Sequence, residues 1–482
     1  MAKQSVITGA LASVLGQASV LLLGYGTHLI IGRYLGPASY GIYGVILSIQ
    51  TILGLLLTLG IPTAVARFVA QDEQHAGSIL HQALRLQFMM AAVVSVVVLL
   101  LSVPLARLLG DEALVSYLRF TALVVFLQAG YPMYAQFFSG LHRFNRQALL
   151  TTIYAVAKFV GSVTLLFVFA VYGAFAGFAI GGCIALLLGW YWTRGYSGQP
   201  GHRLALKDFL SFAGAYVVIL LSLQVLISLD LLMVKALLHD NKLAGYYNAA
   251  VTLSRISYQL LQAIGLVLLP RVSALTKPGA SHDTAVRFIE EALRYLIIVI
   301  VPSVALAAAT STSLVRLFFS QRYLPAAPIL ALLMLGLGSL AFYSLLVTIS
   351  ARAGRTRVSM LATFALIALS FVLGLVFIPR FQLIGAAWQT TLAGGIGLIF
   401  MGVYTFRTFS LPVPWRVMLN VLCATAIAVA PTLVWHASPL LLPVQYVVLC
   451  LLFIATLLAL KEITPADRQR IAALHPRLQW VA

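Results

Sequence analysis

Runs without a charged residue constrain this chain more than any other feature of its 482 residues. The longest run covers 417–460, and others cover 34–66 and 159–193. A helix needs about 20 predominantly apolar residues to cross a bilayer. Only 9% of the residues are charged, against about 25% in soluble domains, which is too few to cover a surface exposed to water. The sequence therefore predicts an all-α polytopic membrane protein.

Fourteen transmembrane helices are predicted from these runs. Stretches too long for one crossing must be divided, near Tyr172-Gly173 and between Pro439 and Pro443. An even number of spans leaves both termini on one side of the membrane. The predicted spans are 7–31, 41–65, 84–109, 118–139, 149–170, 174–193, 209–234, 245–270, 292–315, 327–350, 358–378, 384–406, 417–436 and 444–460.

The basic residues orient these spans. The chain has 31 Lys and Arg against 12 Asp and Glu, a net charge of +19. Of the 31, 21 fall on the side that holds the termini and eight on the other side. Lys and Arg are enriched in cytoplasmic loops. We therefore expect a multi-pass protein of the cytoplasmic (inner) membrane with both termini in the cytoplasm, and the positive charge calls for no nucleic-acid partner.

An internal repeat relates the first six spans to the next six. An offset of 204 residues matches Gly41, Tyr43 and Arg67 with Gly245, Tyr247 and Arg271, and an offset of 209 matches Arg143 and Arg146 with Arg352 and Arg355. Because six is even, both copies enter the membrane in the same orientation, as in parallel-repeat secondary transporters. We predict an N-terminal six-helix lobe (1–195), a second six-helix lobe (196–406), transmembrane helices 13 and 14 (407–460) and a cytoplasmic tail (461–482).

Three segments carry a family resemblance. Residues 32–70 read GRYLGPASYGIYGVILSIQTILGLLLTLGIPTAVARFVA, residues 245–275 read GYYNAAVTLSRISYQLLQAIGLVLLPRVSAL, and residues 384–388 read IGAAW. With Ser228-Leu229-Asp230, they resemble the polysaccharide transporter family, part of the multidrug/oligosaccharidyl-lipid/polysaccharide flippase superfamily. The resemblance covers the whole chain, and it marks the superfamily better than the substrate.

The resemblance implies two lobes around a central, typically cationic cavity. It also implies a flippase that moves undecaprenyl-pyrophosphate-linked oligosaccharide (an O-antigen, capsule or exopolysaccharide repeat unit) across the membrane by alternating access. A polysaccharide polymerase and glycosyltransferases of cell-envelope synthesis would be its partners. The family's cavity is built mainly from the first two helices of each lobe.

Arg255 lies inside the eighth span, where a charge is costly unless it faces protein or water. The other polar side chains on its helical face are Asn248, Gln259 and Gln262. A guanidinium binds phosphate oxygens bidentately, so we expect this face to contact the substrate's pyrophosphate. The alternative is a structural ion pair with Asp230.

Lys158 lies midway along the fifth span and shares a face with Thr151, Tyr154 and Ser162. It is interpreted either as a second cationic wall of the cavity or as a lysine bound by neighbouring carbonyls. Asp230 is the acid inside a predicted span. It can serve as an ion-coupling site or, as we favour, pair with Lys235 or Arg33 near the surface.

Further polar residues can bind substrate or neighbouring helices. Gln17, Gln50 and Gln224 can bind sugar hydroxyls, or hydrogen-bond across helices instead. Six arginines at the cytoplasmic ends of spans can recruit an anionic lipid-linked substrate to an entrance, although cytoplasmic loops are rich in arginine in any case. They are Arg67, Arg271, Arg143, Arg146, Arg352 and Arg355.

Several other functions lack their expected sequence signals. The chain has no P-loop motif and no metal-ligand cluster, so no cofactor, no metal and no enzymatic activity are expected. An organic-cation exporter of the drug-efflux branch usually has an acid in its N-terminal lobe, and spans one to six contain none. A lipid II flippase would be expected to carry several basic residues in the cavity helices of the first lobe, and span one has none. A membrane-embedded polymerase would need a longer external loop.

Overall fold

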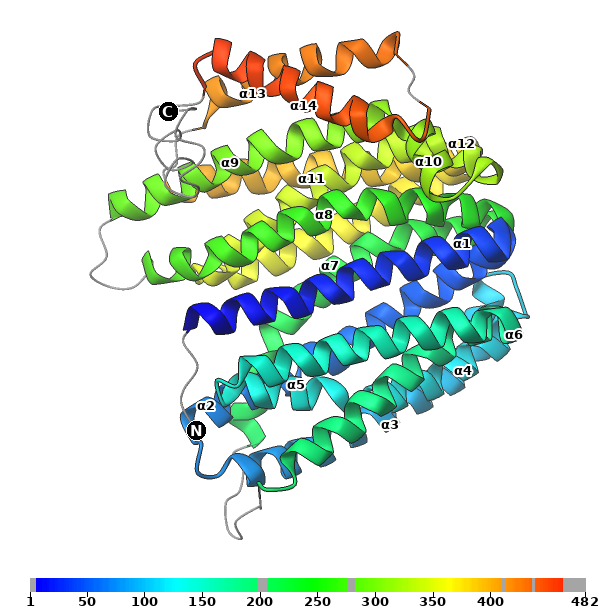
Figure 1. Cartoon of the computed structure of the whole chain (residues 1–482), viewed down its shortest axis with the longest axis vertical. Helices are drawn as coiled ribbons and strands as arrows, with labels where there is room; N and C mark the ends of the chain where they lie inside the picture. The colour runs from blue at the N-terminus through cyan, green and yellow to red at the C-terminus, as the bar shows by residue number, and fades with distance from the viewer. Residues whose placement is uncertain (1–5, 197–205, 276–281, 410–412, 436–437, 463–482) are drawn as a thin grey trace. The chain divides into compact units, whose positions relative to one another are not determined.

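The computed structural model describes residues 6–196, 206–275, 282–409, 413–435 and 438–462. Within these ranges it leaves out the side chains of 6–13, 206–216, 262–275, 282–289 and Arg352. The described residues form helices and no β-strand (Figure 1). The helices are α1 (Val6–Leu59), α2 (Ile61–Gln71), α3 (Ala76–Leu108), α4 (Leu114–Gln128), α5 (Tyr131–Gly140), α6 (Phe144–Thr193), α7 (Leu206–Leu238), α8 (Asn241–Leu275), α9 (His282–Ala309), α10 (Ser311–Phe318), η1 (Gln321–Ala326), α11 (Ala327–Arg352), α12 (Thr356–Thr408), α13 (Trp415–Val429), η2 (Ala430–Leu433) and α14 (Leu442–Ala459).

Ten helical segments among the described residues are long and apolar enough to cross a membrane. Their outward side chains are apolar: Leu100, Val168 and Ile399 are 72%, 71% and 68% exposed. Apolar surface on this scale is unfavourable in water and favourable against lipid tails. The predicted class, a multi-pass α-helical membrane protein, is therefore confirmed.

Three of the ten segments contain a residue outside helical backbone geometry. The breaks lie at Gly36 in α1 (φ 74°), Ala170 in α6 (φ 49°, ψ −125°) and Gln382 in α12 (φ 50°, ψ −127°). In α6 the chain folds back on itself at this break. The close approach is evident at Gly173, where an added Cβ would lie 2.0 Å from the Leu165 carbonyl oxygen. The fold-back predicted near Tyr172-Gly173 is confirmed, and the break lies two residues before Tyr172.

The turns of α6 and α12 correspond at an offset of 212. Ala170 and Gln382 have nearly equal dihedral angles, and Gly385 approaches Phe377 as Gly173 approaches Leu165. The turn before each helix also corresponds: the N–H of Arg143 donates to Phe138 O, and the N–H of Arg355 donates to Ser350 O. The predicted match of Arg143 with Arg352 was therefore wrong by three residues. Each segment has two arginines three residues apart, so the two sequences can be aligned on the wrong arginine of the pair.

The chain packs as two compact units. Unit 1 comprises Met1–Thr252 and Thr363–Ala386, and unit 2 comprises Leu253–Ala362 and Ala387–Ala482. These units follow packing, so the lobe boundaries at 195 and 406, which follow the repeat, stay predictions. Most of the predicted tail lies outside the described residues.

Unit 1 is held together by an apolar core and by one close helix crossing. The core collects buried side chains of α2, α3, α5 and α6, including Val65, Ile79 and Phe137. The crossing joins α1 to the first turns of α8 at the repeat-related glycines. A Cβ on Gly245 would lie 1.8 Å from the Pro37 carbonyl oxygen, so no other residue type fits without displacing the backbone.

In unit 2, the helices α9, α13 and α14 pack against one another. Val421, Ala424 and Leu457 form a buried cluster between these helices. At its edge Arg294 Nε lies 3.2 Å from Glu462 Oε1, and Asn420 Nδ2 donates to Glu462 Oε2 at 2.8 Å. Glu462 is 6% exposed, and these two partners satisfy its carboxylate.

Candidate functional site

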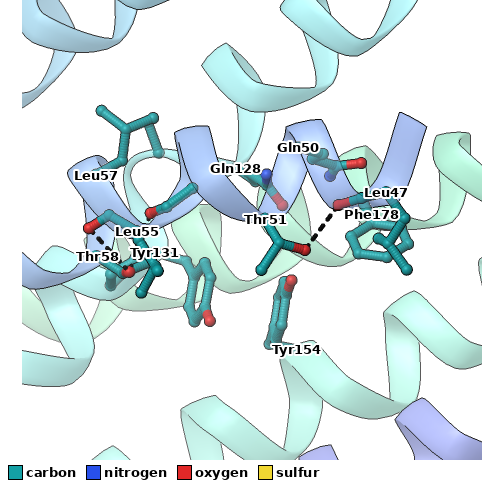
Figure 2. A pocket seen from close by; sticks show the side chains of 13 residues that line it. Leu47, Gln50, Thr51, Leu55, Leu57, Thr58, Gln128, Tyr131, Tyr154 and Phe178 are labelled. Carbon is teal, nitrogen blue, oxygen red and sulfur yellow. Dashed lines mark hydrogen bonds between the residues drawn. The ribbon is translucent and has the colours of Figure 1, made fainter. Parts of the chain in front are cut away.

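A cavity of about 200 Å³ lies in unit 1 between α1, α4, α5 and α6 (Figure 2). The 13 lining residues that the structure describes include no carboxylate. Their polar side chains come from all four helices: Gln50, Thr51, Thr58, Gln128, Tyr131 and Tyr154. Apolar side chains, Leu47 and Phe178 among them, line the rest.

The wall from α1 follows helical spacing. Leu47, Gln50, Thr51, Gly54 and Thr58 recur at intervals of three and four, so they share one face. The Thr51 hydroxyl donates to Leu47 O at 2.7 Å, drawn as a dashed line in Figure 2. The Thr58 hydroxyl donates to Gly54 O at 3.0 Å. Both hydroxyl oxygens therefore remain acceptors toward the cavity.

Gln50 is 3% exposed, and its amide is unusual. Neither Nε2 nor Oε1 has a hydrogen-bond partner among the described residues, and both atoms are shielded from water. An unpaired buried amide costs about 1–3 kcal/mol. The same unit contains a contrasting glutamine: Gln87 Nε2 donates to Leu57 O at 2.7 Å and to Ala129 O at 2.9 Å. The Gln87 amide therefore bonds the backbone of two neighbouring segments, whereas the Gln50 amide makes no hydrogen bond among the described residues.

Aromatic rings and one ammonium group form the opposite side. Tyr131 and Tyr154 stack with ring centroids 3.9 Å apart. Lys158, one turn after Tyr154, is 9% exposed, and its Nζ lies 4.7 Å from the Phe178 centroid and 5.6 Å from the Tyr154 centroid. These are cation–π distances. Within the described part of the chain Lys158 has no ion pair. Its charge is thus held beside the cavity by aromatic faces.

Of the eight predicted substrate-binding residues, Gln50 lines this cavity, and Lys158 packs against two of its lining rings, those of Tyr154 and Phe178. Asn248 is 5% exposed and donates to Tyr40 O at 3.1 Å, which joins α8 to α1. Gln224 donates to the Ser228 hydroxyl at 3.0 Å, and Gln17 is exposed on α1. Asn248 therefore bonds across helices, whereas Gln224 bonds within α7, and their substrate-binding roles stay predictions.

Arg255 and Gln259 belong to unit 2 and do not line the unit 1 cavity. Arg255 is half-buried on α8. Gln259 is also half-buried, and its Oε1 has no hydrogen-bond partner in the described ranges. The side chain of Gln262 lies outside the described residues. The shared polar face of this helix stays a prediction.

Asp230 is 2% exposed and has two local donors. Its Oδ2 accepts from the Tyr247 hydroxyl at 2.8 Å and its Oδ1 from the Leu231 N–H at 2.7 Å. Of the two partners favoured for Asp230, Lys235 bonds Asp111 instead, and pairing with Arg33 stays a prediction. Residues five apart on a helix point about 140° apart, so Asp230 and Lys235 face different neighbours.

The partner of Lys235 was not anticipated from the sequence. Asp111, in the loop between α3 and α4, accepts from Lys235 Nζ at 2.9 Å, from Asn241 Nδ2 at 2.8 Å and from the Ala113 N–H at 3.1 Å. Partial burial alone would raise the pKa of Asp111, but the bonds from Lys235 and Asn241 and the lysine charge outweigh it and lower that pKa. We call Asp111, Lys235 and Asn241 the loop clasp. No local motif marks it, since Asp111 lies 124 residues from Lys235 and 130 residues from Asn241.

The six predicted entrance arginines lie in both units. In unit 1, Arg67 is exposed, Arg143 lies 5.4 Å from the Tyr196 ring and Arg146 lies 5.8 Å from the Phe138 ring. In unit 2, Arg355 is exposed, and the side chains of Arg271 and Arg352 lie outside the described residues. Their gathering at one entrance stays a prediction.

Comparisons with known proteins add family and fold. A family model described as "Polysaccharide biosynthesis protein" matches residues 6–276. An uncharacterized membrane protein of Methanocaldococcus jannaschii is 29% identical over 161 residues, and the match spans 33% of this chain and 31% of that relative's length.

Among solved structures, the lipid II flippase MurJ in an inward closed conformation matches with a TM-score of 0.77 and 15% identity, over 94% of this chain and 99% of that one. An inward-facing multidrug resistance MATE family transporter of the MOP superfamily matches with a TM-score of 0.66 and 16% identity, over 83% and 98%. At these identities the likeness concerns the fold.

Proposed function

Because the chain belongs to the polysaccharide biosynthesis protein family, we propose that it is a flippase for undecaprenyl-pyrophosphate-linked oligosaccharide. The cargo is a repeat unit of O-antigen, capsule or exopolysaccharide, carried across the cytoplasmic membrane by alternating access. A polysaccharide polymerase and glycosyltransferases are its proposed partners. The activity is transport and not catalysis.

The observation that carries this proposal is the kind of polar group at the unit 1 cavity. It presents amides, hydroxyls and the neighbouring Lys158 ammonium, and the residues described around it include no acid. Amides and hydroxyls suit sugars, and an ammonium suits an anionic headgroup. An organic cation would meet repulsion and no carboxylate, which argues against the drug-efflux alternative.

Arg255 is the proposed contact for pyrophosphate. It lies well inside α8, and a guanidinium there can bind two phosphate oxygens at once. Phosphate binding would offset the cost of placing a cation at this depth. Asn248, Gln259 and Gln262 complete the proposed polar face. For Asp230, local pairing is the favoured role and ion coupling is the alternative.

Fourteen crossings with both termini in the cytoplasm complete the proposal. Each of the three interrupted segments, α1 with α2, α6 and α12, is long enough for two crossings. With α8 counted as well, the ten apolar segments become fourteen crossings. The positive-inside rule then places the termini in the cytoplasm. Two lobes, one for each copy of the repeat, would enclose a central cavity.

A lipid II flippase is the second candidate, supported by the fold shared with MurJ. Lipid II and the proposed cargo share the polyprenyl pyrophosphate, so Arg255 and Lys158 suit either. The glycan distinguishes them. Transport assays with both lipids therefore decide between the two candidates.

The test uses full-length protein in liposomes with fluorescent undecaprenyl-pyrophosphate-linked oligosaccharide, and it measures the rate at which label crosses. We expect Arg255→Ala to lower the rate about 10- to 100-fold, which corresponds to losing charge-assisted bonds to phosphate. Arg255→Lys should retain part of the rate. Arg119→Ala, an exposed arginine on α4, is the matched control. Equal transport by Arg255→Ala at equal membrane abundance would contradict the phosphate role, and no transport of any lipid-linked glycan by wild type would contradict the function.

A further inference from the structure

We propose that the end of α6 carries a binding site for an anionic phospholipid of the surrounding bilayer. The site consists of the Arg194 guanidinium and of an apolar stripe on α6 that leads to it. It lies wholly in unit 1, and none of its residues lines the unit 1 cavity. The inference goes beyond the proposed function, since it holds for any cargo.

The apolar stripe consists of outward side chains at helical spacing. Ile184, Leu187, Trp190 and Tyr191 recur at intervals of three and four, and they are 43%, 62%, 50% and 61% exposed. From Ile184 to Arg194 the helix rises about 15 Å at 1.5 Å per residue, which is about half the hydrocarbon thickness of a bilayer. The stripe therefore matches one leaflet, with an acyl chain along the apolar side chains and the headgroup at Arg194.

Arg194 is held at the end of this stripe by aromatic rings. Its Cζ lies 3.9 Å from the Trp190 ring centroid and 5.4 Å from the Tyr191 centroid, which are cation–π distances. Trp and Tyr rings of membrane helices are enriched at the level of the lipid headgroups. A guanidinium that packs on a ring keeps its N–H donors for oxygen atoms, and Arg194 has no ion pair among the described residues. Its donors therefore remain for a phosphate group.

A second guanidinium lies beside the same helix end. The Tyr196 N–H donates to Thr193 O at 2.9 Å, so Tyr196 stays close to the last turn of α6. Its ring packs edge-on against buried Phe137, with centroids 5.2 Å apart, and Arg143 Cζ lies 5.4 Å from its centroid. Because the Tyr196 ring is held by Phe137, Arg143 is positioned next to the end of the stripe.

The charge around these arginines selects an anionic headgroup. No Asp or Glu occurs between positions 113 and 207 of the sequence. The ammonium of a zwitterionic headgroup would therefore find no carboxylate on this segment, whereas an anionic headgroup meets two guanidinium groups. The stripe faces the bilayer, in which phospholipid is the surrounding solvent, so we assign the site to phospholipid and not to the cargo.

Tryptophan quenching measures which lipid lies beside Trp190. Full-length protein with Trp190 as its single tryptophan is placed in vesicles of phosphatidylcholine and phosphatidylglycerol, one of which carries brominated acyl chains that quench an adjacent ring. Phosphatidylglycerol should bind about tenfold or more tightly, because each arginine at a membrane surface strengthens binding of an anionic lipid about fivefold. The tryptophans replaced by Phe are Trp192, Trp388, Trp415, Trp435 and Trp480.

Variants of Arg194 assign the preference to this site. Arg194→Gln should lower the preference about fivefold, and Arg194→Lys, which keeps the charge, should retain most of it. Arg119→Gln, which changes an exposed arginine on α4, is the matched control and should leave the preference unchanged. A preference below twofold, or an equal preference in Arg194→Gln, would overturn the site.

Two further measurements protect the test. In the chain with all its tryptophans, phosphatidylglycerol should raise the melting temperature in detergent more than phosphatidylcholine does, and this difference should shrink in Arg194→Gln. An equal rise with both lipids would count against the site. Undecaprenyl pyrophosphate, added at a tenth of the amount of phosphatidylglycerol, should leave the quenching unchanged. Displacement of brominated phosphatidylglycerol would assign the site to the cargo and overturn the phospholipid proposal.

Discussion

Two buried lysines of unit 1 have opposite surroundings. Lys235 is 1% exposed and bonds the Asp111 carboxylate at 2.9 Å within the loop clasp. Lys158 is 9% exposed and lies against the aromatic rings of Phe178 and Tyr154, beside the cavity. Lys235 is neutralised by its own chain, so its charge is structural. Lys158 lacks an acidic partner in the described structure, so its charge remains for a ligand.

The two lysines are therefore expected to affect different properties: Lys235 the stability of the fold, and Lys158 the transport activity. A paired buried charge stabilises the fold only while its partner is present, because the remaining partner would be desolvated and unpaired. An unpaired buried charge costs stability and persists where function needs it. Substituting each lysine in turn should therefore move different measurements.

The largest effect is expected from Lys235→Met, which removes the charge and keeps much of the side-chain volume. Asp111 would keep Asn241 but lose its cation, so the free energy of unfolding should fall by about 3 kcal/mol. Thermal or denaturant unfolding in detergent measures this. Transport per folded molecule should stay near wild type, and an unchanged stability would show that the ion pair is dispensable.

Lys158→Met should give the reverse result. We expect transport of lipid-linked oligosaccharide to fall about 10- to 100-fold, the loss that follows removal of a charged contact to an anion. Stability should hold or rise, since an unpaired ammonium is no longer buried. Lys158→Arg, which keeps the charge, should transport better than Lys158→Met. Full transport by Lys158→Met would remove the distinction between the two lysines.

The smallest effect concerns pH and the loop clasp. The pKa of Asp111 is lowered in the folded state, so its stabilising contribution is complete above the ordinary value of about 3.9 and is lost as pH falls below it. The melting temperatures of wild type and Asp111→Asn should differ at pH 7 and converge below about pH 4. A constant difference down to pH 3 would contradict the lowered pKa.

Local pattern made the class, the family and the turn in α6 predictable. Apolar runs, a charge asymmetry and glycine at the fold-back all depend on neighbouring residues. Gln50 and Lys158 were also among the residues named from sequence, because polar groups inside spans are few. Predictions of pairing fared worse: Lys235, one of the two partners expected for Asp230, bonds Asp111 instead, and Arg143 was matched with Arg352 instead of Arg355.

The sequence by itself determined a polytopic helical membrane protein with a repeated arrangement of turns, since hydrophobic length and helical period are local properties. Only the tertiary structure decided which buried polar groups already have partners. Asn248 binds the α1 backbone, Lys235 binds a loop 124 residues away, and the Gln50 amide has no hydrogen-bond partner among the residues that the structure describes. The physical reason is that a hydrogen-bond partner depends on how distant helices approach each other, and helix approach is set by packing across the whole unit.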